Sequence, residues 1–343
     1  MKKILVLLLV LALALPTIAI ADSNELHVLS WLGYVDSDTL TAFEAETGIK
    51  VVWSPMESPE DMLLKLNQSG GKGYDLILSS DYSLDVLRKE GLIQAFDKTQ
   101  LPNYTNIDES FLNQPYDPNN EYVIPYTAGC IVIIYDPSVV TEPITSYNDL
   151  WREDLADSIA LIDNGRVVGG LVLKSLGYSI NETDETRLNE MQEKLMSLYP
   201  NIRTFGDDAT YSALVTGDAS VSLTYAAFAG LAYKDNPDLK VVYPSEGLGF
   251  GIDGFVLSSQ SENVDSAHRF MNWLMRPEVA AHNAQFQSYT NVNKAATPLL
   301  SEEYLNNPIV SVPHSALEGA EIIMDLGAVS TRYQEIFDAL KLQ

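Results

Sequence analysis

Aromatic side chains at the ends of expected β-strands are the residues of this sequence best suited to bind a ligand. These aromatic positions, with one serine beside them, are Trp31, Tyr34, Ser80, Tyr82, Tyr126, Tyr225 and Tyr289. Ligands bind at strand ends in open α/β sheets, and an aromatic face attracts an ammonium group by about 0.5–2 kcal/mol. Each ring taken alone is better explained by packing, but together they predict a box for a cationic amine.

A cationic ligand also needs a carboxylate, and Asp253 is the best candidate. It interrupts an otherwise apolar extended run over 251–257, where an acid without a partner is costly to bury. A helix cap or a salt bridge is the alternative explanation. The whole chain is acidic, with Lys+Arg 21 against Asp+Glu 47 and a net charge of −26. Such a surface repels nucleic-acid phosphates, so we expect no nucleic-acid partner.

The sequence lacks the residue patterns that metal sites, nucleotide sites and catalytic nucleophiles require. The four histidines are scattered without metal-ligand spacing, and neither a Walker loop nor a Gly-x-Ser-x-Gly elbow occurs. The Gly-x-Gly-x-x-Gly match at 249–254 runs into a strand instead of opening a helix, so a dinucleotide site is excluded. The acidic turn at 117–121 lacks the glycine that a calcium loop needs. We therefore expect no catalytic residue, no metal and no cofactor, and the single Cys130 is expected in the core.

Alternating β-type and helical runs are expected to position these residues. The first half is expected to contain strands at 26–29, 49–53 and 74–78 and helices at 39–46 and 59–66. This order is typical of βαβ units and a mainly parallel sheet. Two extended runs at 122–126 and 130–135 are interpreted as a crossing into a second α/β series, and 251–257 as a crossing back. The pattern predicts two lobes around a cleft that closes on a ligand.

The first 21 residues are expected to lie outside the fold. Lys2 and Lys3 precede an apolar run over 4–15, and 19–21 has the small-x-small form of a signal-peptidase site. A retained membrane anchor is the alternative, but Pro16 interrupts the run, which is shorter than the roughly 20 residues a bilayer needs. No cysteine follows the run, so a lipid anchor is excluded. We predict a signal peptide over 1–21 and a periplasmic location.

Several blocks of the sequence, in order, resemble the periplasmic spermidine/putrescine-binding proteins of polyamine ABC importers. The blocks lie at 29–35, 46–51, 74–76, 88–91, 117–120, 243–247 and 293–299. The resemblance implies an α/β, two-lobed type II periplasmic binding protein fold, with two open, mainly parallel sheets joined by extended hinge crossings. The expected N-terminal lobe is 22–128 and 251–297, and the expected C-terminal lobe is 129–250 and 298–343.

The resemblance also implies site residues. The aromatic and hydroxyl positions of the family correspond to Trp31, Tyr34, Ser80, Tyr82, Tyr225 and Tyr289, and one carboxylate corresponds to Asp253. The family's second-lobe acidic pair falls on Asn164 and Val167, an aromatic on Gly251 and a glutamine on Ile323. One carboxylate serves one ammonium group, and a second ammonium buried alone would cost several kcal/mol. Two alternatives stay open, namely a replacement acid among Asp163, Asp207, Asp208 and Asp325, or a ligand with a single ammonium group.

The sequence thus predicts a monomeric, non-enzymatic, exported solute-binding protein. It would capture a small cationic amine, a polyamine such as putrescine or spermidine, and deliver it to the membrane permease of an ABC transporter. The predicted ligand-binding residues are Trp31, Tyr34, Ser80, Tyr82, Tyr126, Asn164, Tyr225, Asp253 and Tyr289. The alternative hypotheses for the function are a binding protein for a monoamine or amino acid, a secreted enzyme, and a ligand-sensing protein that has lost transport.

Overall fold

The computed structural model describes residues 24–287, 289–317 and 319–343, so the expected signal peptide at 1–21 lies outside the described residues. The strands are β1 (Glu25–Ser30), β2 (Lys50–Pro55), β3 (Leu76–Ser80), β4 (Ile93–Gln94), β5 (Val123–Tyr135), β6 (Ile159–Leu161), β7 (Ile202–Phe205), β8 (Val221–Tyr225), β9 (Lys240–Val242), β10 (Gly249–Ser258), β11 (Thr290–Asn291) and β12 (Glu321–Ile322). The α-helices are α1 (Ser37–Thr47), α2 (Pro59–Ser69), α3 (Asp81–Lys89), α4 (Gly165–Ser175), α5 (Glu185–Met196), α6 (Asp207–Thr216), α7 (Ala226–Asp235), α8 (Val264–Leu274), α9 (Pro277–Gln287), α10 (Glu302–Asn306) and α11 (Val329–Lys341).

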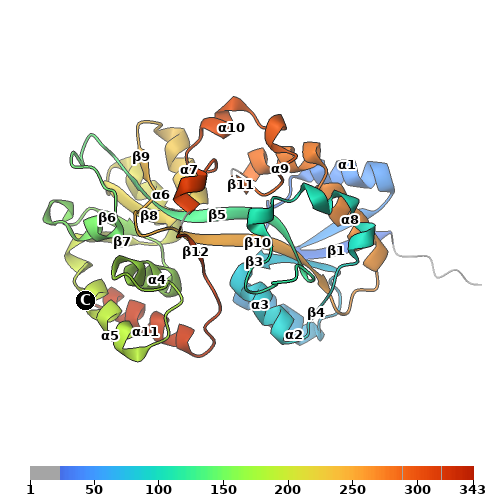
Figure 1. Ribbon diagram of the computed structural model, residues 1–343, viewed down its shortest axis with the longest axis horizontal. Helices are drawn as coiled ribbons and strands as arrows, with labels where there is room; N and C mark the ends of the chain where they lie inside the picture. Colours follow the sequence, from blue (N-terminus) through green and yellow to red (C-terminus); the bar gives the residue numbers. More distant parts are fainter. Residues whose placement is uncertain (1–23, 288, 318) are drawn as a thin grey trace, which may run out of the picture.

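Two α/β halves are joined by the long strands β5 and β10, which run side by side through the middle of the molecule (Figure 1). At one end of the sheet β1 pairs in parallel with β2 and β3, and at the other end β6 pairs in parallel with β7 and β8. Between them β10 pairs antiparallel with β3 and β5, and β5 pairs antiparallel with β8. The expected α/β fold is confirmed. The two parallel parts form one hydrogen-bonded sheet rather than two, because β5 and β10 link them through the ladder.

The crossing strand β5 differs from its expected form. The sequence predicts two extended runs separated at 127–129, but the structure contains one strand through this point. Thr127, Ala128 and Gly129 pair with Asp253, Ile252 and Gly251 of β10, respectively. Their backbone hydrogen bonds are therefore taken up by the neighbouring crossing strand, which removes the reason for a break. The result is a paired ribbon that connects both lobes.

The core consists of layers on the two faces of the sheet. Leu76 and Leu78 of β3 face a cluster that contains helices α1 and α8, whereas Ile77 faces the cluster beneath α2 and α3. In β5, Cys130 and Ile131 likewise point to opposite faces, and the expected core position of Cys130 is confirmed at 2% exposure. Side chains of a strand alternate between faces, so this double coverage holds the strands rigidly. Rigid strands fix the ends at which the candidate site lies.

Local sequence signals set the boundaries of the helices, as the sequence predicts. The Ser58 side chain accepts a hydrogen bond from the Asp61 N–H at the start of α2, with Pro59 in the first turn. Gly48 ends α1 in the left-handed conformation, with φ 73°, which glycine adopts without steric strain. None of the helices among the described residues has both the length and the apolar character needed to span a bilayer.

Candidate ligand-binding site

A cleft of about 910 Å³ lies between the two halves, beside the crossing strands. It collects residues from the loop that follows β1 and from α3, α4, β8 and β10, which are far apart in the sequence. Eight of the nine predicted site residues line it, namely Trp31, Tyr34, Ser80, Tyr82, Asn164, Tyr225, Asp253 and Tyr289. The fold thus brings these side chains together around one space, and contact of each with a ligand remains a prediction.

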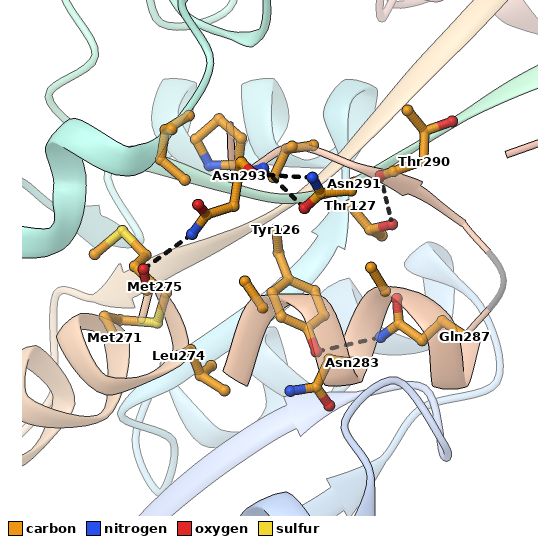
Figure 2. A pocket seen from close by; sticks show the side chains of 15 residues that line it. Tyr126, Thr127, Met271, Leu274, Met275, Asn283, Gln287, Thr290, Asn291 and Asn293 are labelled. Carbon is orange, nitrogen blue, oxygen red and sulfur yellow. Dashed lines mark hydrogen bonds between the residues drawn. The ribbon is translucent and has the colours of Figure 1, made fainter. Parts of the chain in front are cut away.

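The ninth residue, Tyr126, is not among the residues that line the cleft. Its ring packs edge-on against Phe255, with 5.1 Å between ring centroids, and it borders a separate cavity of about 20 Å³. Figure 2 shows this tyrosine among the side chains of that cavity, with its hydroxyl bonded to Gln287. The cavity has room for about one water molecule and not for an organic ligand. Tyr126 instead supports the cleft wall from behind, because its hydroxyl donates to the carbonyl of Tyr34 at 2.9 Å.

Three aromatic rings form a continuous surface in the cleft, which we call the aromatic shelf: Trp31, Tyr34 and Tyr289. The ring centroids of Trp31 and Tyr34 are 4.9 Å apart, and those of Tyr34 and Tyr289 are 6.0 Å apart. Trp31 is held in place through its carbonyl, which accepts a hydrogen bond from the indole N–H of Trp53 at 2.9 Å. Rings spaced in this way offer a long apolar surface with a negative π face, which suits an alkyl chain carrying positive charge.

Asp253 lies against this shelf. Its Oδ2 accepts a hydrogen bond from the Tyr34 hydroxyl at 2.9 Å, and the register of β10 places it opposite Ser80 of β3. Burial raises the pKa of Asp253 to about 6, and the Tyr34 hydrogen bond opposes that shift. Burial and the neighbouring Asp253 in turn raise the pKa of Tyr289 to about 12. The tyrosines are therefore neutral hydrogen-bonding groups at neutral pH, and Asp253 supplies the negative charge.

Asp81 is a second acid in this part of the cleft, and sequence reasoning missed it. It is 3% exposed and follows Ser80, the residue opposite Asp253 in the β-ladder. The pKa of Asp81 is raised to about 8, because burial and the charge of Asp253 raise it more than the hydrogen bond from the backbone N–H of Tyr82 lowers it. Its position between Ser80 and Tyr82, both selected from the sequence, was the signal that could have found it.

The opposite wall comes from the second half of the chain. Asn164 begins α4, where its Oδ1 accepts from the Val167 N–H, and its amide nitrogen donates to the Tyr225 hydroxyl at 3.1 Å. Asp207, at the start of α6, also lines the cleft, and its pKa is raised by partial burial and by Asp163. Asn164 thus positions Tyr225, and Asp207 adds a negative charge on this wall.

Three of the positions that differ from the resembled family are apolar or small here. Val167 and Ile323 line the cleft with exposed fractions of 4% and 8%. Gly251 also lines it, and a Cβ atom added there would lie 3.9 Å from Asp81 Oδ2, with no closer neighbour. The glycine therefore leaves open space next to the Asp81 carboxylate.

Comparisons with known proteins agree with this geometry. The model of the bacterial extracellular solute-binding protein family matches residues 38–312. The chain is 35% identical over 332 residues to the spermidine/putrescine-binding periplasmic protein of Escherichia coli, covering 96% of this chain and 95% of that protein. It is 31% identical over 323 residues to the putrescine-binding periplasmic protein PotF of Escherichia coli, covering 88% and 87%. The crystal structure of the spermidine/putrescine transporter substrate-binding protein PotD from Streptococcus pneumoniae has a TM-score of 0.86 at 32% identity, covering 93% of this chain and 98% of that one.

Proposed function

The chain belongs to the bacterial extracellular solute-binding protein family, and from this premise we propose that it captures a polyamine between its lobes and delivers it to the permease of an ABC importer. The observation that carries this proposal is the lining of the cleft, where an aromatic shelf adjoins buried carboxylates. A polyamine is the complementary ligand, because it combines apolar methylene groups with ammonium ends. The polyamine-binding names of two relatives at 35% and 31% identity support the same ligand class.

One end of the ligand is assigned to the Asp253 carboxylate. The ammonium group would pair with Asp253, while the methylene chain lies on the aromatic shelf. Ser80, Tyr34 and Tyr82 are the hydroxyl groups that would complete the hydrogen bonds of this end. An ion pair in a water-poor cleft beside π faces is stronger than the same pair in water. The roles of these residues are part of the proposal.

The other end of a diamine needs a second acid, and Asp207 is the best placed of the four candidates. Asp208 is not among the residues lining the cleft. Asp163 and Asp325 line it but already face lysines, at 2.7 and 3.5 Å. Asp207 lines the cleft, and its Oδ1 accepts a hydrogen bond from the backbone N–H of Asp163 at 3.1 Å. We assign the second ammonium group to Asp207.

The remaining features of the proposal follow from the family. A solute-binding protein of a transport system acts outside the cytoplasm by binding, so we propose no catalytic step, a periplasmic location and a cleaved signal peptide over 1–21. We further propose that it acts as a monomer whose lobes, 22–128 with 251–297 and 129–250 with 298–343, close on the ligand. The names of the relatives favour a polyamine over a monoamine or an amino acid.

Calorimetric titration with matched amines tests the ligand class. The protein, unfolded and refolded to strip carried-over ligand, is expected to bind putrescine with micromolar affinity, about 8 kcal/mol. Butylamine has the same four-carbon chain and one ammonium group, so it should bind about tenfold more weakly. Asp207→Asn should weaken putrescine binding by about fivefold to tenfold, which is the range of a partly exposed ion pair, and leave butylamine binding unchanged.

Asp208→Asn is the matched control, because it removes the same charge from the neighbouring residue outside the cleft. It should leave the affinity for both amines unchanged. Absence of heat with putrescine, spermidine and spermine from a folded protein would refute the polyamine proposal. If Asp207→Asn left putrescine binding intact in a protein that binds it, only the assignment of the second acid would be wrong.

A further inference from the structure

Two carboxylates lie next to each other at one end of the cleft. The antiparallel register of β3 and β10 pairs Ser80 with Asp253, and Asp81 is the next residue along the chain. One oxygen of Asp81 accepts a hydrogen bond from the backbone N–H of Ile252 at 3.3 Å, and the other accepts from that of Tyr82 at 2.8 Å. The side chain of Asp81 therefore lies over the residue that precedes Asp253. Both acids line the cleft.

No cation of the described chain neutralises this pair through an ion pair. Arg166 of α4 is the basic group whose charge acts on Asp81. Its guanidinium donates to the carbonyl of Ile180 at 2.8 Å, to Asn181 and to the carbonyl of Met324, and it stacks on a tyrosine ring. Arg166 thus ties α4 to the segment around β12, and it acts on Asp81 through its charge without a direct ion pair.

Three phenols also interact with the pair. The Tyr34 hydroxyl donates a hydrogen bond to Asp253, and the charge of the same carboxylate raises the pKa of Tyr289. Tyr116 feels the charge of both acids, and burial raises its pKa well above the ordinary value, so it stays neutral. Ionising both of two adjacent carboxylates in such surroundings costs free energy, because their negative charges repel each other. The pKa of Asp81 is raised to about 8 and that of Asp253 to about 6, so the pair retains one proton at pH 7.

Space for a ligand adjoins the Asp81 carboxylate. Gly251 lines the cleft, and the nearest atoms to a Cβ placed on it are Asp81 Oδ2 and the carbonyl oxygen of Gly129, both at 3.9 Å. An ammonium group that reaches Asp253 from the aromatic shelf therefore has room to contact Asp81 as well. Its three N–H donors suit two carboxylates and a hydroxyl better than one carboxylate alone.

We propose that Asp81 and Asp253 together bind one primary ammonium group of the ligand, and that the pair releases its shared proton to solvent as the amine binds. This inference rests on the proposed function, because it concerns the same ligand. The carboxylic acid loses one proton to the buffer, while the ammonium group keeps all of its N–H bonds. The incoming positive charge replaces the proton, so both acids are ionised in the complex.

The sign of the pH dependence follows from this exchange. The ligand-free pair holds the proton below about pH 8, so an amine must displace it there. Affinity should therefore rise with pH between about 6 and 8, by about tenfold per pH unit near pH 7, and level off above that range. A site made of Asp253 alone would level off near pH 6.

The test is titration calorimetry with putrescine at pH 7 and pH 8, in several buffers of different ionisation enthalpy that are not themselves cationic amines. We expect about one proton released per putrescine at pH 7 and about half a proton at pH 8. Asp81→Asn should lower the release at pH 7 below about 0.2 proton and weaken binding about tenfold. Asp208→Asn should release as many protons as the wild-type protein.

The outcomes separate this inference from the proposed function. Putrescine binding without proton release at pH 7 would overturn the shared-proton site and leave the polyamine proposal intact. An unchanged proton count in Asp81→Asn would also overturn it, because Asp81 would then serve only to hold the backbone of β10. If the wild-type protein bound no polyamine, the proposed function itself would fail. The wild-type proton count needs no variant and so does not depend on how Asp81→Asn folds.

Discussion

Asp253→Asn should weaken polyamine binding by about 2–5 kcal/mol, roughly 30-fold to several thousand-fold. The substitution removes a carboxylate that lines the cleft and has no ion-pair partner among the described residues. The loss is large because the ammonium group of the ligand would then be desolvated without a full counter-charge. Calorimetric titration with putrescine at pH 7 measures it.

Folding of the Asp253→Asn protein provides the control. An asparagine oxygen can still accept the hydrogen bond from the Tyr34 hydroxyl. Burial raises the pKa of the carboxyl to about 6, above its value in an unfolded chain, so ionisation of Asp253 at pH 7 opposes folding. The variant should therefore unfold at the same temperature as the ligand-free wild-type protein or at a higher one. A protein that folds in this way and binds putrescine with unchanged affinity would show that the ion pair is wrongly assigned.

Trp31→Ala should weaken polyamine binding by about 1–3 kcal/mol, roughly fivefold to 150-fold. The indole supplies one end of the aromatic shelf, 4.9 Å from the ring of Tyr34, and its loss removes both a π face and apolar contact area from the ligand. The hydrogen bond from the Trp53 indole goes to the backbone carbonyl of residue 31, so it survives the substitution. The measurement is again the affinity for putrescine and spermidine.

Trp31→Phe is the graded control, because it keeps an aromatic face of smaller area at the same position. It should bind more weakly than the wild-type protein and more tightly than Trp31→Ala. Spermidine should lose at least as much affinity as putrescine, since its longer chain covers more of the shelf. Equal affinities in the wild-type protein and Trp31→Ala would contradict the role of the aromatic shelf.

The sequence predicted the fold and one side of the cleft well because the signals there are local. Alternating apolar runs indicated the βα units, and Ser58 with Pro59 indicated the start of α2. The crossing at β5 was predicted with a break, since Ala128 and Gly129 have weak strand propensity by themselves. Pairing with β10 overrides that propensity, and such pairing between residues more than a hundred positions apart leaves no local trace.

The acids were harder to assign because a cleft combines strand ends that are distant in the sequence. Asp253 was recognisable from the apolar run around it, but Asp81 occupies the first turn of α3, where an acid is expected for helical reasons alone. Its proximity to Asp253 depends on the register of β3 against β10. Asp207 could not be distinguished from Asp163 and Asp208 until the lysine facing Asp163 and the cleft lining were known.

Tyr126 illustrates the limit of the strand-end argument. It lies on the same crossing strand as residues of the cleft wall, but its ring packs against Phe255 and borders the small cavity of Figure 2. Cys130 lies four positions further along β5, belongs to the same core cluster and lines the cleft, so the alternation of side chains does not distinguish the two residues, and their places along the strand do. Its hydrogen bond to the Tyr34 carbonyl makes it part of the frame that holds the aromatic shelf.

The most direct measurement is a crystal structure of the refolded protein with putrescine. The account predicts one ammonium nitrogen within about 3 Å of an Asp253 carboxylate oxygen, which is charge-assisted hydrogen-bond distance, and the second ammonium directed toward Asp207. The methylene chain between them should lie against Trp31 and Tyr289. A diamine bound outside the cleft, or one in the cleft with neither ammonium group contacting Asp253, would contradict the account.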